Sequence, residues 1–387
     1  MKKTKCIYRM LVFISLFFTL SCSKKEIELP VINPTNLLKD ELKLTDFADE
    51  VTYLQLDNSI MLPDIKDIKK TESGYLIITL DQLFCFGNNG KFKNKIGDNG
   101  NGPQEYSRIY DFTFDPDTKL IYLLDYKKVH VLTFEGEYKY SFKTPEELSF
   151  IRIQYFNHQL IFPKGFSFDG LSNEWYATDL NGKVLFKKNN SISTTNISVD
   201  YNINPVFNCN NNIYYWNQLN DTIFSIGEKV EPTYIFSGGK FRINNNDLST
   251  EDNFREKDSW MLISVLGTDK FLIFDYILMK ERKEIYVFYD KENQRMHEWA
   301  VLEKNKLKGE NAFDSGPRFI PKSYFEIKGE EYLLSWINAF ELKAHVVSDA
   351  FKNSTPKYPE KKKQLEQLAN SLDENDNPVL MLVKLKN

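Results

Sequence analysis

The sequence has 387 residues, of which 27% are charged, 42% hydrophobic and 14% aromatic, with a formal net charge of −4 at pH 7. This composition excludes a disordered chain, a collagen-like fibre and a coiled coil, and the length suffices for two ordinary domains or one large all-β domain. The aromatic content favours β structure, because aromatic side chains prefer half-buried pleated surfaces. Four cysteines are too few for a disulfide scaffold of this length.

Residues 1–21 have the features of a secretory signal peptide. Lys2, Lys3, Lys5 and Arg9 form a basic start, and residues 10–20 form a short apolar run. A run of eleven residues falls short of the ~20 needed to span a bilayer. We therefore expect this segment to be removed after export.

The end of the apolar run carries a second signal. The tetrapeptide Thr19-Leu20-Ser21-Cys22 resembles a bacterial lipobox, which implies that Cys22 is acylated and becomes the first residue of the mature protein. The alternative is an ordinary signal peptide with an incidental cysteine. Residues 22–46 begin with a polar stretch and are expected to form a tether from the lipid anchor.

The mature protein is acidic. Residues 1–21 contain four basic and no acidic residues, so their removal changes the formal net charge from −4 to −8. The sequence has no basic stripe and no RNA-binding motif, and nucleic acid is therefore not an expected partner.

Strand-like runs alternate with turn signals along the chain, and the turns recur at a fixed spacing. Gly90, Gly136 and Gly182 are 46 residues apart, and Gly227 follows 45 residues later. Such glycines suit tight hairpins, whose central residues take positive φ. A repeat of ~40–50 residues with several short strands is typical of a β-propeller built from four-stranded blades. The alternative, a β-sandwich with coincidental spacing, gives no reason for four turns in register.

The repeat predicts an all-β fold with six blades over residues 47–387. The strand-like segment 50–56 is expected to pair with the last strand and close the ring, which removes an exposed edge. The polar segment 243–262 is expected to be an insertion with a helical end, and the leucines at 365, 368 and 372 predict a helix. Cys85 and Cys209 fall in the first and fourth blades, on opposite sides of the ring, and should stay unpaired.

Two passages resemble those of a known family. Residues 96–106, IGDNGNGPQEY, are similar to the G-x-G-P-G-E-Y loop of the six-bladed β-propeller lipoproteins common in Bacteroidetes, except that Gln104 stands where glycine is usual. Residues 376–380, DNPVL, resemble the ending of the same family. The resemblance implies a propeller in the cell envelope, and it implies no catalytic residues.

The glycine-rich loop supplies the candidate binding residues. Glu105, Tyr106 and Arg108 are candidates for ligand contact, and the alternative is a structural connector in which Glu105 accepts backbone N–H bonds. The four histidines are far apart in the sequence, and no zinc, phosphate-loop or nucleophile motif is present. The sequence therefore predicts no catalytic residue, no metal and no cofactor.

Two functions fit this sequence. The first is a lipid-anchored, non-catalytic binding module for a glycan, a peptide or an outer-membrane or periplasmic protein. The second is a propeller enzyme, such as a glycoside hydrolase or lyase, with acidic residues at the central channel. The absence of a catalytic motif favours the binding module. The residues after Cys22 favour an anchor in the outer membrane that faces the periplasm, with the cell surface as the alternative.

Overall fold

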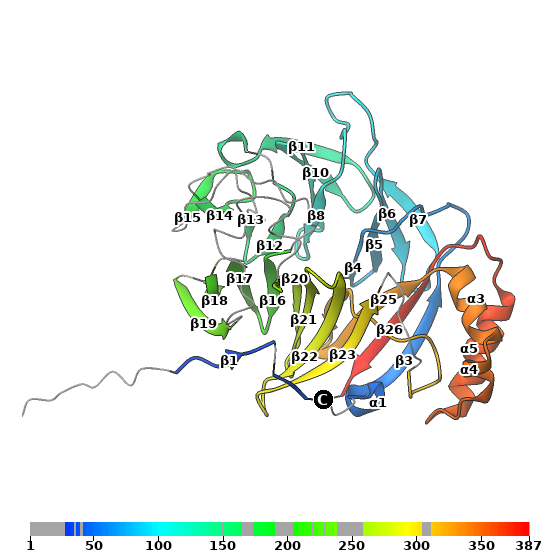
Figure 1. The fold of residues 1–387 in the computed structure, drawn as a ribbon. Coiled ribbons are helices and arrows are strands. Elements are labelled where there is room, and N and C mark those ends of the chain that lie inside the picture. Colours follow the sequence, from blue (N-terminus) through cyan, green and yellow to red (C-terminus); the bar gives the residue numbers. More distant parts are fainter. Residues whose placement is uncertain are drawn as a thin grey trace, which may run out of the picture.

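The computed structural model describes residues 28–34, 36–38, 42–148, 150–163, 173–189, 204–217, 220–227, 229–237, 258–303 and 311–386. They form six sheets arranged in a ring around a central channel (Figure 1). The predicted six-bladed propeller is thus confirmed. No helix in the described part of the chain is long and apolar enough to cross a bilayer.

Each blade begins with the strand that lines the channel and continues outwards by antiparallel pairing. Blade 1 consists of β4 (Asp67–Thr71), β5 (Gly74–Ile78), β6 (Leu83–Gly87) and β7 (Phe92–Ile96). Blade 2 consists of β8 (Asp111–Asp115), β9 (Leu120–Asp125), β10 (Lys128–Thr133) and β11 (Tyr138–Lys143). Blade 3 consists of β12 (Gln154–Phe156), β13 (Gln159–Pro163), β14 (Asn173–Thr178) and β15 (Val184–Asn189). A short 3₁₀ helix, Pro145–Glu147, precedes blade 3.

Blades 4 to 6 follow the same plan. Blade 4 consists of β16 (Val206–Cys209), β17 (Asn212–Asn217), β18 (Asn220–Ile226) and β19 (Val230–Phe236). Blade 5 consists of β20 (Trp260–Gly267), β21 (Phe271–Leu278), β22 (Lys283–Asp290) and β23 (Arg295–Glu303). Blade 6 consists of β24 (Ser323–Ile327), β25 (Glu330–Ile337), β26 (Val379–Leu385) and β3 (Ala48–Gln55). Residues 260–262, expected at the helical end of an insertion, are the start of β20, and residues 243–257 lie outside the described residues.

The glycine repeat marks the same hairpin in successive blades. Gly90, Gly136 and Gly182 lie between the third and fourth strands of blades 1 to 3, with φ of 74°, 90° and 86°. Gly227 lies at the corresponding place between β18 and β19. The period of 46 residues is therefore the length of one blade.

The core consists of layers between blades rather than one central cluster. Between blades 1 and 2, for example, Leu76 and Cys85 pack with Phe112 and Leu123. Because a blade has neighbours on both faces, its second strand is buried on both; all of β5 is buried, which explains its continuous apolar run. Cys85 and Cys209 are free, as predicted.

The two ends of the chain close the ring. β3 forms the outer strand of blade 6 and pairs antiparallel with β26, with Val51 opposite Val383, as the sequence predicts. Upstream, β1 (Val31–Ile32) and β2 (Leu37–Leu38) pair in parallel with the outer strands of blades 4 and 5. Contact with the propeller therefore begins within residues 22–46, the segment expected to be a tether.

The helices gather on blade 6. The short helix α1 (Leu44–Phe47) leads into β3, and the insertion between β25 and β26 holds α3 (Ala339–Val347), α4 (Asp349–Asn353) and α5 (Pro359–Ser371). Figure 1 shows these three helices on the outer side of β26 and β3. Leu365 and Leu372 are buried there in a separate small core with Leu342 and Phe351, so the predicted helical spacing is confirmed.

Candidate functional site

The central channel contains a cavity of about 1060 Å³. All six blades contribute to its wall through their inner strands or the residues just before them. The lining combines charged, polar and aromatic groups, including Lys66, Asp67, Arg152, Tyr155 and Trp336. Ligand pockets in proteins are commonly about 300–1,000 Å³. The channel is thus large enough for an organic ligand and is the candidate site.

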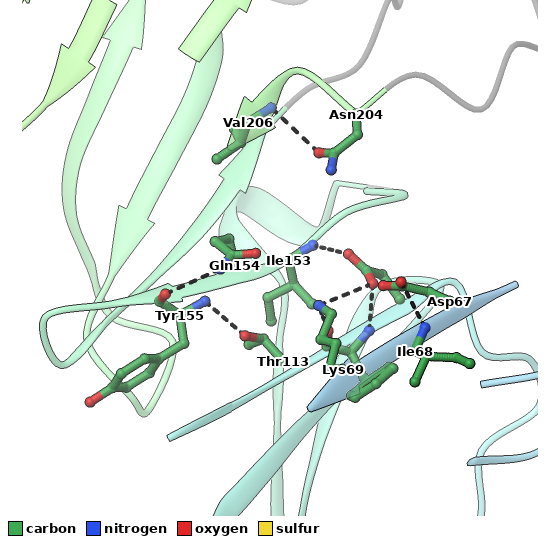
Figure 2. A network of polar contacts seen from close by, with 11 residues as sticks. Asp67, Ile68, Lys69, Thr113, Ile153, Gln154, Tyr155, Asn204 and Val206 are labelled. Carbon is green, nitrogen blue, oxygen red and sulfur yellow. Dashed lines mark hydrogen bonds and ion pairs between the residues drawn. The ribbon is translucent and has the colours of Figure 1, made fainter. Parts of the chain in front are cut away.

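Side chains connect the inner strands of blades 2 and 3 at the channel wall (Figure 2). Asp111 on β8 accepts a hydrogen bond from the backbone N–H of Ile153 at 3.0 Å. Thr113, two residues further along β8, accepts from the N–H of Tyr155 at 2.9 Å. These bonds satisfy backbone donors at the start of β12 and just before it.

Blade 1 joins the same network through a lysine. Lys69 on β4 donates to the carbonyl of Phe112, and its ammonium lies 3.7 Å from Asp111 Oδ1. It also lies over the Phe112 ring, 4.8 Å from the centroid. Burial raises the pKa of the neighbouring Asp67 and Asp111 raises it further, whereas the positive charges of Lys69 and Arg152 and the hydrogen bond from the N–H of Ile68 oppose both effects. Lys69 is therefore a counter-charge for both carboxylates, and Arg152 is a second one for Asp67.

Three basic residues lie at the ends where inner strands begin. Lys66 and Lys322 directly precede β4 and β24, and Arg152 lies two residues before β12. The backbone N–H of Lys66 donates to Ile78 O and that of Lys322 to Leu334 O, both at 2.9 Å, so these two lysines have the same register in their blades. All three residues line the cavity. We call the edge of the channel on which they lie the entry rim.

A fourth cation, Arg108, lies close to this rim. Burial lowers the pKa of Lys66, the positive charges of Arg108 and Arg152 lower it further, and Asp81 opposes them. Arg108 and Arg152 thus act on the same lysine of blade 1. Arg108 is exposed, and its guanidinium lies 5.0 Å from the centroid of the half-buried Tyr110 ring.

A buried carboxylate positions Arg108. Asp125 accepts hydrogen bonds from the backbone N–H groups of Ser107 and Arg108, at 3.0 and 3.3 Å, and from the Ser107 hydroxyl at 2.8 Å. The fully buried His130 lies 3.5 Å from the same carboxylate. Burial alone would raise the pKa of Asp125, but these hydrogen bonds together lower it. Asp125 thus remains ionised and holds the end of the glycine-rich loop.

Glu105 has a structural role in the glycine-rich loop, which was the alternative to ligand contact. Its carboxylate accepts a hydrogen bond from the backbone N–H of Gly102 at 2.7 Å. A Cβ at Gly100 would lie 2.0 Å from Glu105 Oε2, so the loop closes tightly only with glycine there. Tyr106 is completely buried, and its hydroxyl donates to Ile96 O at 3.4 Å.

The predicted site residues therefore have different surroundings. Glu105 contacts its own loop, Tyr106 belongs to the core between blades 1 and 2, and Arg108 reaches the entry rim. Ligand contact by any of them stays a prediction. Cys22, the predicted lipid attachment site, lies outside the described residues.

The sequence analysis did not identify the basic residues of the inner strands. Lys66, Lys69 and Arg152 are ordinary charged residues in sequence, and none belongs to a motif. The blade period could have identified these residues, because the first strand of each unit faces the channel in a propeller. Basic residues just before those strands could have been compared between blades.

A second pair of carboxyl groups lies in blade 5. Asp275 on β21 is opposite Tyr286 on β22, and Glu284 is on the same face of the sheet. Burial, the charge of Glu284 and a hydrogen bond with Glu284 raise the pKa of Asp275 to about 8. Tyr286 donates a hydrogen bond to Glu284. The neutral form of Asp275 is therefore favoured near pH 7.

The substitution Asp275→Asn should stabilise the protein at alkaline pH. In the folded wild-type protein Asp275 holds a proton that the unfolded chain releases near the ordinary pKa of an aspartate. The stability that this proton contributes is complete at acidic pH and is lost as the pH rises through about 8. The asparagine needs no proton. We expect Tm of the variant to exceed that of wild type by roughly 2–5 °C at pH 8.5, and the difference to narrow towards pH 5.

Scanning calorimetry across this pH range would measure the effect. Asp290→Asn is the matched control, because hydrogen bonds from Asn293 and Glu292 outweigh burial and lower the pKa of Asp290. That variant should lose stability relative to wild type at pH 8.5. A difference for Asp275→Asn that does not change with pH would contradict the protonation argument.

The sequence matches the family described as "Domain of unknown function (DUF4934)" over residues 29–384. This chain belongs to that family. The match covers every blade and both short parallel strands at the N-terminus. No curated protein matches the sequence.

Two solved structures that are similar to this chain come from Bacteroides. One, from Bacteroides fragilis and described as an exported protein, is 17% identical with a TM-score of 0.65, covering 93% of this chain and 100% of its own. Another, from Bacteroides vulgatus and described as a member of the DUF4221 family, is 10% identical with a TM-score of 0.49, covering 88% of this chain and 98% of its own. At such identities the first similarity supports the fold alone.

Proposed function

We propose that this DUF4934 protein is a lipid-anchored β-propeller of the bacterial cell envelope that binds a ligand in its channel without transforming it. The observation that carries the proposal is the cavity of about 1060 Å³ with a basic entry rim. Binding sites are typically preformed concave pockets with a few convergent polar groups. The channel has both properties, and its wall is held by the side-chain network of blades 1 to 3.

The distribution of carboxyl groups favours binding over catalysis. Asp67 and Asp111 line the channel on blades 1 and 2, and Asp275, which interacts with Glu284, lines it on blade 5. Among the described residues, no three His, Cys, Asp or Glu side chains form a group suited to a metal ion. Asp111 also has a structural role, since it accepts the N–H of Ile153 and contacts Lys69.

The N-terminal sequence supports the location. The basic start, the short apolar run and Cys22 are the parts of a lipoprotein signal, and a propeller of the same fold is described as exported. Glu28 lies six positions after Cys22, and six residues span at most about 20 Å. The anchor would therefore hold blade 4, where β1 pairs, close to the membrane. We propose the outer membrane, with the propeller facing the periplasm.

Metabolic labelling with radioactive palmitate would test the anchor. We expect the full-length protein to incorporate label and to fractionate with membranes, and Cys22→Ala to lose the label. Cys6→Ala is the control, because it removes a cysteine that precedes the apolar run. Equal labelling of wild type and Cys22→Ala would refute the lipoprotein proposal, and in-cell cross-linking would then identify any fixed protein partner separately.

An array of oligosaccharides and peptides would test binding in the channel. Ser323→Trp adds bulk at a half-buried position that lines the cavity next to the rim, and Gln364→Trp adds the same bulk on the exposed face of α5. We expect to find a ligand that wild type and Gln364→Trp both bind and that Ser323→Trp does not bind. Recovery of the ligand chemically unchanged would support binding without turnover, and a cleaved product would favour the enzyme.

A further inference from the structure

The outer strand of blade 3 differs from those of blades 1 and 2 in the residues that it exposes. On β7 and β11 every exposed side chain is a lysine, and lysines on an edge strand discourage pairing with other chains. On β15 three consecutive large apolar residues are exposed instead: Val184 at 38%, Leu185 at 41% and Phe186 at 60%. Contiguous exposed apolar surface marks a site of contact with a protein or a membrane.

The outer edge of blade 4 extends this surface. Its outermost strand is β1, on which Val31 is 59% exposed, and Val230 at the start of β19 is 38% exposed. Five of the eleven large hydrophobic side chains that are exposed in the described part of the chain therefore lie on two consecutive blades. Figure 1 shows β15, β19 and β1 on one side of the ring and α3 on the opposite side. We call Val31, Val184, Leu185, Phe186 and Val230 the apolar edge.

The charged residues beside the apolar edge have both signs. Lys183 and Lys187 flank the apolar run of β15, and Lys187 pairs with Glu146 at 2.9 Å. On blade 4, Lys229 and Glu231 stand on either side of the exposed valine of β19, and both are exposed. Lysine side chains beside an apolar surface can extend along it and leave the ammonium among polar groups. These residues suit the boundary between the headgroups and the acyl chains of a bilayer, and they give neither an acidic nor a basic partner a clear advantage.

The proposed lipid anchor brings the membrane to this side of the molecule. Glu28 lies six positions after Cys22, so it is within about 20 Å of the acylated residue. Val31 follows three positions later and belongs to the apolar edge. A bilayer is thus the surface that the chain itself places near these residues, whereas no feature of the described residues places a protein partner there.

We propose that the apolar edge lies on the membrane surface, with the propeller standing on the outer strands of blades 3 and 4. Apolar side chains that enter the interface leave water, and this gain adds to the hold of the acyl chains. Outer strands face away from the central channel, so the channel would run along the membrane and both of its ends would face away from the bilayer. This inference rests on the proposed lipid anchor and adds the orientation of the protein at the membrane.

Photo-cross-linking at two phenylalanines of matched exposure would test this orientation. Phe186 or Phe340 of the full-length protein is replaced by p-benzoylphenylalanine, which bonds to nearby C–H groups when it is irradiated. Phe340 is the control, because it is 54% exposed on α3, the helix on the opposite side of the ring. The added apolar bulk is the same at both positions. Each acylated variant is placed in vesicles of phosphatidylethanolamine and phosphatidylglycerol, and its phospholipid adducts are measured by mass spectrometry.

We expect position 186 to form roughly fivefold more phospholipid adduct than position 340, because the apolar edge reaches the bilayer and α3 does not. Adding Val184→Gln and Leu185→Gln removes apolar surface on either side of the contact and should lower the adduct at position 186 roughly threefold. All the substituted side chains are exposed, so melting curves of the variants should lie close to that of wild type and show that they are folded.

Other outcomes would overturn the inference in distinguishable ways. Equal phospholipid adducts at both positions, or none at either, would refute the orientation and leave the anchor intact if Cys22 carries palmitate in the same samples. The absence of palmitate at Cys22 would refute the anchor, and the orientation with it. A protein adduct at position 186 in intact cells, in place of the phospholipid adduct, would assign the apolar edge to a protein partner instead.

Discussion

Replacing Asn377 with alanine should destabilise the protein by about 3–4 kcal/mol. Asn377 is buried and belongs to the DNPVL ending. Its side-chain oxygen accepts from the N–H of Leu62 at 2.8 Å, and its amide donates to the carbonyls of Asp57 and Ile60 at 2.7 and 2.6 Å. Alanine would leave these groups of the β3–β4 connection without their partner, and buried groups in that state are costly.

Urea denaturation and hydrogen exchange would measure this effect. We expect a lower urea midpoint and faster exchange in β3 and β26, because Asn377 joins the start of the last strand to the connection that follows β3. Asn375→Ala changes an exposed asparagine two residues away and is the control. If both variants unfold at the same urea concentration as wild type, ring closure does not depend on this asparagine.

Replacing Asp111 with alanine should cost about 2–4 kcal/mol and loosen the channel wall. The substitution leaves the buried N–H of Ile153 without an acceptor and removes the carboxylate that contacts Lys69. Asp111→Asn keeps one side-chain oxygen as an acceptor, so it should restore part of the loss. A thermal melt combined with hydrogen exchange at Ile153 would test both variants.

Asp117→Ala is the control for this experiment, because Asp117 is exposed at the turn that follows β8. Its free energy of unfolding should lie within about 0.5 kcal/mol of the wild-type value, as is usual for surface substitutions. Protection of the Ile153 amide in Asp111→Ala equal to that in wild type would show that the blades are held by apolar packing alone.

The same network connects stability and the proposed binding. Lys69 and Asp111 lie in the wall of the channel, whereas Lys66 and Arg152 line it just before the inner strands begin. Substitutions in the wall should therefore change both folding and binding. Substitutions at the rim should change binding alone, which makes the rim the better place to test function.

The sequence by itself determined the blade plan. The glycines at 90, 136 and 182 have positive φ because the hairpin between the third and fourth strands requires it, and that local requirement repeats in blades 1 to 3. The apolar runs, such as Tyr75–Ile78, reflect burial on both faces of a blade. Local backbone preference and period thus sufficed for fold class, blade number, ring closure and the free cysteines.

The candidate site depended on tertiary structure. Lys66 and Arg152 are distant in sequence and line one cavity only because the inner strands of their blades start at the same rim. The roles of Glu105 and Tyr106 depended on which neighbours the loop brings to them: Gly102 for one and the core between blades 1 and 2 for the other. Periodicity specifies the order of strands, but the proximity of side chains from different blades follows from closure of the ring.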